Sequence, residues 1–537
     1  MLSYRKLAMR VLGRSLHTGR IDSPRPASQR AAAFILTAAM LTTLAAPAFA
    51  DIWHIENGDI TISAGESGNN VTQNNNTTYG DTNTIITNQN KDTASSHTVT
   101  IEAKDKDDKV EVTLKDVNID TSSRNKAAVS VTGEGDTNIK LDGDNALKSD
   151  IYRSGIYGSG SGSLTISGGE NDSLMAQGGS GANGISSSGS LTISGGTVTA
   201  NGDDGGRGIS SSGSVTISGG STVTANGGSG TISGGDGIWS GGGVTISGGS
   251  TVTANGGNGG SLVGGDGIRS GGGLTVSDGT VTAKGGNGDS KDGYGGDGIR
   301  SGGVVTISGN TVNAAGGYGG KVGGYGICSF DRVAISGGTV EAAGGNGSTG
   351  GGSGIYSSVI DLSGSLELTA KAGSPTGKAL LQNGRELDLD TIKDKLGPGA
   401  KVTATDADGK VIDQVSTPRP VEPEESSSSS DGGSAAPSAP ASPLPGLTVT
   451  DKDGQRISYT STQSGNTLTV CVGRFTASFR ISLAALRQLR AEGIETITFQ
   501  TVLCSTTLSV DELLAMGGED AEAVLTHRFT DSSLTVG

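Results

Sequence analysis

Three aspartates recur at one position of a repeated sequence. Asp236, Asp266 and Asp297 each stand two residues before an isoleucine, within the string Gly-Gly-Asp-Gly-Ile. If the repeats stack as parallel β-strands, equivalent residues lie about 4.8 Å apart and the carboxylates form a column. Like charges at that spacing repel unless a cation or a basic residue lies between them. Carboxylate oxygens are ligands that Ca²⁺ prefers, so the column predicts a calcium site formed by these three residues.

A second set of candidate residues follows the same isoleucine. Trp239, Arg269 and Arg300 stand one residue after it in these three repeats, and Tyr157 and Tyr356 occupy the same position in others. Arginine binds carboxylates through two parallel hydrogen bonds, and aromatic rings present a flat apolar face against which a sugar ring can pack. Together the two columns predict a Ca²⁺-assisted platform for an acidic saccharide.

The same pattern also has a purely structural interpretation. Aspartate in a turn accepts hydrogen bonds from nearby backbone amides, and an exposed aspartate next to an arginine forms an ordinary surface ion pair. Both interpretations stay open at the level of sequence, because each requires the same residues at the same spacing.

An enzyme of the same fold is a third alternative. An inverting glycosidase needs two carboxylates about 6.5–9.5 Å apart, which neighbouring repeats could supply. However, the aspartates lie in near-identical repeats and nothing distinguishes one repeat as catalytic. Beyond residue 50 the sequence has three histidines, His54, His97 and His527, and no Ser/His/Asp set or Cys/His cluster can be assembled from them. A non-enzymatic binding function is therefore favoured over a lyase or glycosidase.

These residues must be positioned by a repeated element. Eight isoleucines serve as its markers, with spacings of 29, 24, 29, 30, 31, 28 and 28 residues: Ile156, Ile185, Ile209, Ile238, Ile268, Ile299, Ile327 and Ile355. Each repeat has three short runs of alternating apolar and polar residues, separated by glycine, as in Val244–Ile246 and Val252–Ala254. Alternation of this kind is typical of strands with one buried face. The sequence predicts an all-β, right-handed parallel β-helix solenoid with three short strands per coil and about 24–31 residues per repeat.

Repeat length varies at one corner. Nine residues separate Ala200 from Ile209, whereas 16 separate Ala283 from Ile299. A strand cannot change length without turning its side chains outward, but a surface loop can. We therefore expect the Gly/Asn/Asp loops of this corner to lie on the surface and to be a place for binding.

The first 50 residues have the features of an export signal. A basic segment precedes an apolar run from Ala31 to Ala46 and the small-x-small sequence Ala48–Ala50, which predicts cleavage after Ala50 and a secreted or cell-surface protein without a transmembrane anchor. Cleavage removes seven positive charges and one negative charge, so the net charge changes from −15 to −21. Such an acidic chain is a poor partner for nucleic acid.

Composition divides the remaining chain into five parts. We expect an N-terminal cap with irregular first coils at 51–96, the β-helix at 97–375, a C-terminal cap with a hairpin at 376–415, a disordered Pro/Ser linker at 416–446 and a small α+β domain at 447–537. The last domain shows strand patterns and a helix beginning after Ser482. Within it, Cys471 and Cys504 either form a disulfide or stay reduced. Cys328 follows a marker isoleucine and is expected to point outward.

The repeats resemble those of a known group of proteins. The string Thr-Ile-Ser-Gly-Gly-x-Val-Thr-Ala, with the preceding segments Val112–Ile119 and Ile139–Leu147, is similar to the repeats of secreted right-handed β-helix proteins of Gram-positive, largely clostridial, bacteria. The resemblance covers about residues 51–375 and implies a carbohydrate-binding domain that takes acidic plant cell-wall polysaccharide and holds calcium. Similar repeats occur in adhesin-like surface proteins. The main prediction is thus an exported carbohydrate-binding β-helix, and the alternative is a surface adhesin or structural protein. The sequence does not indicate the oligomeric state in either case.

Overall fold

The computed structural model describes two parts of the chain. They are residues 51–418 and 446–536, apart from 452–455, 458, 465, 473–476, 502–504, 517–520 and 528–531. They belong to two compact units, Met1–Pro423 and Glu424–Gly537, and each unit is considered by itself. The expected signal segment 1–50 and residues 419–445 of the expected linker lie outside the described residues. No helix among the described residues is long and apolar enough to cross a membrane.

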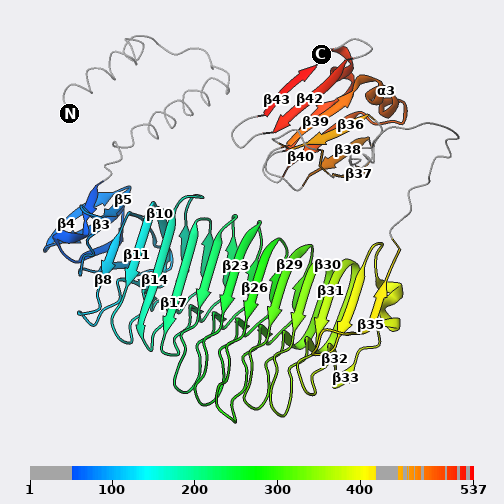
Figure 1. Cartoon of the computed structure of the whole chain (residues 1–537). Helices are drawn as coiled ribbons and strands as arrows, with labels where there is room; N and C mark the ends of the chain where they lie inside the picture. The colour runs from blue at the N-terminus through cyan, green and yellow to red at the C-terminus, as the bar shows by residue number, and fades with distance from the viewer. Residues whose placement is uncertain are drawn as a thin grey trace, which may run out of the picture. The chain divides into compact units, whose positions relative to one another are not determined.

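The first unit is a parallel β-helix of about 13 turns, as the repeats predict (Figure 1). Its first sheet contains the marker isoleucines, and each strand pairs in parallel with its counterpart one coil later. Its strands are β2 (Ile60–Gly65), β6 (Val99–Ala103), β9 (Val129–Gly133), β12 (Ile156–Gly158), β15 (Ile185–Ser187), β18 (Ile209–Ser211), β21 (Ile238–Ser240), β24 (Ile268–Ser270), β27 (Ile299–Ser301), the beginnings of β30 (Ile327–Ala343) and β31 (Ile355–Lys371), and β32 (Leu380–Gln382).

Two further sheets complete each coil. The second contains β1 (Ile52–His54), β5 (Thr84–Thr87), β7 (Lys109–Lys115), β10 (Asp136–Asp142), β13 (Leu164–Ser167), β16 (Leu191–Ser194), β19 (Val215–Ser218), β22 (Val244–Ile246), β25 (Leu274–Val276), β28 (Val305–Ile307) and the middle of β30 and β31. The third contains β8 (Asn118–Asp120), β11 (Asp144–Lys148), β14 (Ser173–Ser180), β17 (Thr197–Asp203), β20 (Thr222–Asn226), β23 (Ser250–Asn255), β26 (Gly279–Lys284), β29 (Asn310–Ala315), the ends of β30 and β31, and β34 (Lys401–Thr405).

The core consists of columns of identical or similar side chains. All eight marker isoleucines are fully buried. In the second sheet Val244 lies in register with Leu274, and in the third Val252 lies in register with Val281. Because side chains alternate between the two faces of a strand, the intervening threonines face outward. Burial of each Ile, Leu or Val side chain stabilises the fold by about 1.5–3 kcal/mol, so every added coil contributes to one continuous core.

Both ends of the β-helix are covered by chain of a different kind. At the N-terminal end, β2, β3 (Gly68–Gln73) and β4 (Asn76–Asp81) form an antiparallel meander beside the short 3-10 helix η2 (Ile55–Asn57). At the C-terminal end, β33 (Arg385–Glu386) and β35 (Val411–Ser416) turn back antiparallel on β32 and β34. Between them the 3-10 helix η3 (Leu389–Lys395) packs Leu389 and Ile392 into the core. These elements cover sheet ends that would otherwise present unpaired strands.

The variable corner is more ordered than its length variation suggests. Loops of successive coils, which project together from the green part of the β-helix in Figure 1, also pair in parallel. One such column runs through Gly230, Gly259, Gly288, Gly319 and Gly347. The backbones approach so closely that a Cβ on Gly286 would lie 1.9 Å from the carbonyl oxygen of Gly257. Glycine is therefore required there by close packing of backbones rather than by flexibility.

The second unit is a small α+β domain. One sheet contains β36 (Leu447–Thr450), β39 (Ala477–Ser482), β42 (Glu522–His527) and β43 (Ser532–Val536), and the other β37 (Thr460–Ser464), β38 (Thr467–Cys471), β40 (Thr496–Gln500) and β41 (Ser505–Ser509). Helices α3 (Leu483–Ala491) and α4 (Val510–Ala515) begin after Ser482 and Ser509, whose hydroxyls accept backbone amide protons. The rings of Phe479 and Phe499 lie 4.8 Å apart in its core. Cys504 lies outside the described residues, so its pairing with Cys471 stays a prediction.

We predict that glycine is required for stability where the backbones of adjacent corner loops touch, but not at every position of these loops. Gly286→Ala should lower the free energy of unfolding by about 1–3 kcal/mol, because the added methyl group overpacks against the neighbouring backbone. Gly350→Ala is the matched control, since a Cβ there meets only side-chain atoms at 3.5 Å or more. Urea unfolding of the full chain measures both. Equal effects of the two substitutions would contradict the account of the corner.

Candidate functional site

All five predicted saccharide-binding residues lie in one outward column of the first sheet. From one coil to the next the register runs through Tyr157, Ser186, Ser210, Trp239, Arg269, Arg300, Cys328 and Tyr356. The structure thus brings Trp239, Arg269 and Arg300 together in consecutive coils. Tyr157 is separated from them by two serines and Tyr356 by Cys328, so these two tyrosines flank the cluster rather than belong to it.

The three aspartates also form a column, but they are buried beneath it. Asp236, Asp266 and Asp297 are 7%, 6% and 4% exposed. The Oδ1 atoms of Asp236 and Asp266 accept the amide protons of Asp266 and Asp297 at 2.9 and 2.7 Å. Oδ1 of Asp297 continues the pattern by accepting the amide proton of Tyr325 at 2.7 Å. The column is therefore a ladder in which each side chain caps the backbone of the next coil.

The remaining carboxylate oxygens are partly paired with arginines. Oδ2 of Asp236 lies 3.3 Å from Nε of Arg207, and Oδ2 of Asp297 lies 3.3 Å from Nη1 of Arg300. Both features of the structural interpretation, amide capping and arginine pairing, are thus present. Among the described residues no group of three or more His, Cys, Asp or Glu side chains could hold a metal ion. The Oδ1 atoms of the three aspartates are engaged with the backbone, and a calcium ion at these residues stays a prediction.

A surface groove of about 440 Å³ lies between the first sheet and the corner loops. We call it the corner groove. Asp236, Asp266, Arg207, Arg269 and Arg300 line it, together with glycines of the loops. Its floor is thus acidic and nearly buried, whereas three guanidinium groups belong to its lining. The groove is where the two predicted columns meet the variable corner.

Arg207 is the site residue that sequence reasoning missed. It occupies the position of Asp236 one coil earlier, and its amide donates to Oδ1 of Asn183 at 2.8 Å in the same ladder. Its guanidinium lies 4.4 Å from the ring centroid of Trp239, which holds the indole ring in place by a cation–π contact. An alignment of the repeats on the residue before Gly-Ile would have revealed Arg207, because it is a basic residue at the position where the later repeats have aspartate.

The other two arginines differ in how firmly they are held. Arg300 is fixed by its ion pair with Asp297 and lies 5.2 Å from the ring centroid of Phe330. The Arg269 side chain is exposed, and its guanidinium makes no hydrogen bond or ion pair with any residue that the structure describes. A guanidinium without an internal partner keeps all five donors for a ligand. Arg269 is therefore the member of the groove most available for binding an anion.

Burial changes the ionisation of the ladder. The pKa of Asp266 is raised to about 8, first by burial and then by the charges of Asp297 and Asp236. Burial also raises the pKa of Asp297 to about 6, although the Tyr325 amide and Arg300 counteract it. Burial and the neighbouring carboxylates thus favour the protonated form of Asp266 at neutral pH. The floor of the groove consequently carries less negative charge than its two carboxyl groups, those of Asp236 and Asp266, suggest.

Cys328 corrects one prediction about this column. It occupies the expected position between Arg300 and Tyr356, but it is buried, being only 1% exposed. We attribute the burial to these larger neighbours, since Tyr356 also stacks on Tyr325 with ring centroids 5.0 Å apart. Burial raises the pKa of the thiol to about 12, so it is not a reactive nucleophile at neutral pH.

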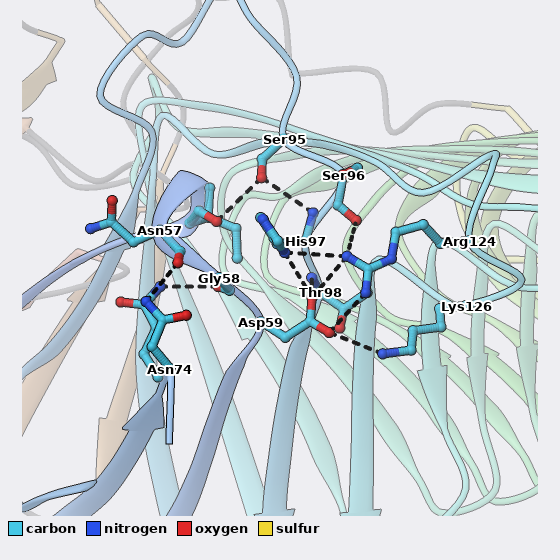
Figure 2. Close-up of polar contacts among 12 residues, drawn as sticks. Asn57, Gly58, Asp59, Asn74, Ser95, Ser96, His97, Thr98, Arg124 and Lys126 are labelled. Carbon is cyan, nitrogen blue, oxygen red and sulfur yellow. Dashed lines mark hydrogen bonds and ion pairs between the residues drawn. The ribbon is translucent and has the colours of Figure 1, made fainter. Parts of the chain in front are cut away.

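A second cluster of charged residues lies near the N-terminal end (Figure 2). Asp59 accepts hydrogen bonds from the Thr98 amide and from Arg124 and Lys126, at 2.9–3.1 Å, and lies 3.2 Å from His97. Although burial raises it, the pKa of Asp59 is held at about 2 by Lys126, the Thr98 amide and His97. Because its donors and acceptors satisfy one another, this cluster joins the first coils and is not a ligand site.

Comparison of this chain with known protein families, with curated proteins and with solved structures finds no match. The resemblance of the repeats to carbohydrate-binding β-helix proteins therefore stays a prediction. What the groove binds has to be argued from its own geometry and charge.

We predict that Asp266 makes the β-helix less stable as pH rises. Its folded pKa of about 8 exceeds the ordinary value of 3.8. The folded state therefore binds the extra proton between these values, and its stability falls as pH rises through that window. The substitution Asp266→Asn keeps the side-chain oxygen that accepts the Asp297 amide proton but removes the negative charge. It should raise the thermal midpoint at pH 8.5 by about 2–4 °C and by less at pH 5, where only the lower part of this window has been crossed.

The control for this prediction is Asp289→Asn, the same substitution at an exposed position of the corner. It should leave the difference between pH 5 and pH 8.5 unchanged. A midpoint for Asp266→Asn that follows the unmodified protein at both pH values would show that Asp266 is ionised without cost.

Proposed function

We propose that the protein is an exported, non-enzymatic binder of acidic polysaccharide and that the corner groove is its binding site. The observation that carries this proposal is the concentration of basic side chains. The chain has a net charge of −15, yet Arg207, Arg269 and Arg300 line one groove. An acidic surface repels polyanions in general, so a local cluster of arginines favours one defined binding place for an anionic ligand.

The chemistry of the groove suits sugar carboxylates. Guanidinium groups bind carboxylates through two parallel hydrogen bonds, and Arg269 has no internal partner among the described residues. Trp239, held under Arg207, offers an aromatic face beside it. The protonated Asp266 can donate a hydrogen bond instead of repelling the ligand. A uronic acid polymer lying along the column would meet Trp239, Arg269 and Arg300 at successive steps of about 4.8 Å.

The ladder favours binding over catalysis. Asp236, Asp266 and Asp297 all use Oδ1 to cap the backbone of the next coil. With those oxygens engaged and the side chains only 4–7% exposed, the carboxyl groups are poorly placed to reach a glycosidic bond. Export follows from the basic and apolar segments of residues 1–50. Calcium is not needed in this proposal, since arginines supply the positive charge.

The test is titration of the full chain with a galacturonic acid hexamer, with and without EDTA. We expect saturable binding that EDTA does not abolish. Arg269→Ala should weaken it at least about tenfold, which corresponds to the loss of a charged hydrogen bond. Lys284→Ala removes the same charge from an exposed position of the third sheet and is the matched control.

Each rival function gives a different result. No glycan binding in either condition would contradict the proposal and favour an adhesin that binds another surface. Loss of binding in EDTA would favour the calcium-assisted alternative. New reducing ends or unsaturated uronides after incubation with pectin would identify an enzyme.

A further inference from the structure

A cavity of about 630 Å³ lies on the outward side of the third sheet, away from the arginines of the corner groove. We call it the third-sheet pocket. Residues from β8, β11 and β14 line it, together with the corner segments that follow β11 and β14. No part of the proposed acidic-polysaccharide site lies in it, so its chemistry has to be considered separately.

The floor of the pocket breaks the symmetry of the repeats. Asn118, Ala146, Met175 and Thr199 are in register in successive coils, and the later coils continue with polar residues, first threonines and then Asn313 and Glu341. Met175 is thus a long apolar side chain in a column that is otherwise small or polar. It is 50% exposed. Singly exposed apolar side chains are common on protein surfaces, so Met175 gains meaning only together with the exposed apolar residues of the loop beside it.

The loop beside the pocket presents further apolar groups to solvent. Ile151 and Tyr152 are 55% and 77% exposed, and Ile151 lines the pocket. Tyr152 has a φ of +57°, a left-handed conformation that is unfavourable for an aromatic residue. The loop is nevertheless held in place, because the Tyr152 amide donates to the Ser180 carbonyl oxygen at 2.9 Å and Asp150 accepts the Asn125 amide proton at 2.6 Å.

The charge of the third-sheet pocket is opposite to that of the corner groove. Asp120, Asp150 and Asp203 line it, and Lys148 is its one basic lining residue. Lys148 pairs with Asp120 at 3.1 Å. The carboxylates of Asp150 and Asp203 therefore have no cationic partner within the lining. A uronate would be repelled here, whereas a cationic group would be attracted.

We propose that the third-sheet pocket binds amino sugars, that is, hexosamine units with a free ammonium group. Asp150 and Asp203 attract the ammonium, Met175 and Ile151 contact the apolar face of the ring, and Gln177 and Lys148 contact its hydroxyl groups. The protein then binds two classes of glycan, an acidic one in the corner groove and a basic one in the third-sheet pocket. This inference does not depend on the function proposed for the groove.

Calorimetric titration of the full chain with a glucosamine hexamer tests the proposal. Saturable binding is expected, and the N-acetylated hexamer should bind at least tenfold more weakly because it lacks the charge. Met175→Lys should weaken binding of the glucosamine hexamer at least tenfold by placing a like charge on the floor. Met175→Thr restores the residue of the later coils and should weaken binding less, while its thermal midpoint shows that the fold is intact.

Non-specific attraction to an acidic protein is separated by a charge control. Asp203→Asn should weaken binding several-fold, whereas Asp278→Asn, an exposed position outside the pocket lining, should not. Arg269→Ala should leave glucosamine binding unchanged, which separates the two sites. The proposal is overturned if the unmodified chain does not bind the glucosamine hexamer, or if the Met175→Lys variant binds it as tightly as the unmodified chain. It is also overturned if the N-acetylated hexamer binds equally well, or if Asp203→Asn and Asp278→Asn have equal effects.

Discussion

Parallel pairing of each coil with the next is the interaction on which the whole structure depends. Backbone hydrogen bonds fix the distance between coils at about 4.8 Å and allow no slippage, because a shift of one residue would turn the buried isoleucines outward. Equivalent residues of successive repeats consequently stack in columns along the β-helix. Buried columns such as Ile238 above Ile268 provide the core, and outward columns provide surfaces whose chemistry is set by a few substitutions.

The aspartate ladder shows both the benefit and the cost of this arrangement. Each carboxylate satisfies an amide of the next coil, which would otherwise lack a partner at the corner. The same stacking buries Asp236, Asp266 and Asp297 close together, and the resulting repulsion is relieved by Arg207 and Arg300 at the two ends and by protonation in the middle. The arginines and the lowered charge then leave a groove that suits an anionic ligand on an otherwise acidic protein.

Much of the fold could be predicted because the length of the repeat and the pattern within it follow from the coil and its strands. Spacing and alternation gave the strands, their register and the column from Trp239 to Arg300. The sequence alone could not predict how far the side chains of each column are buried from solvent. Burial of the aspartates and of Cys328 depends on neighbouring side chains in adjacent coils rather than on the residue itself. Arg207 escaped notice because it replaces aspartate in the ladder.

The most direct test of the central claim measures distances between successive coils. Thr165, Thr245, Thr275 and Thr306 occupy one outward column of the second sheet. In a chain whose own cysteines are replaced by serine, spin labels pairing position 165 with 245, 275 or 306 span three, four or five coils. The account predicts narrow distance distributions that increase to about 14, 19 and 24 Å in equal steps. Broad distributions, or distances that do not increase with the number of coils, would contradict in-register stacking and both binding surfaces derived from it.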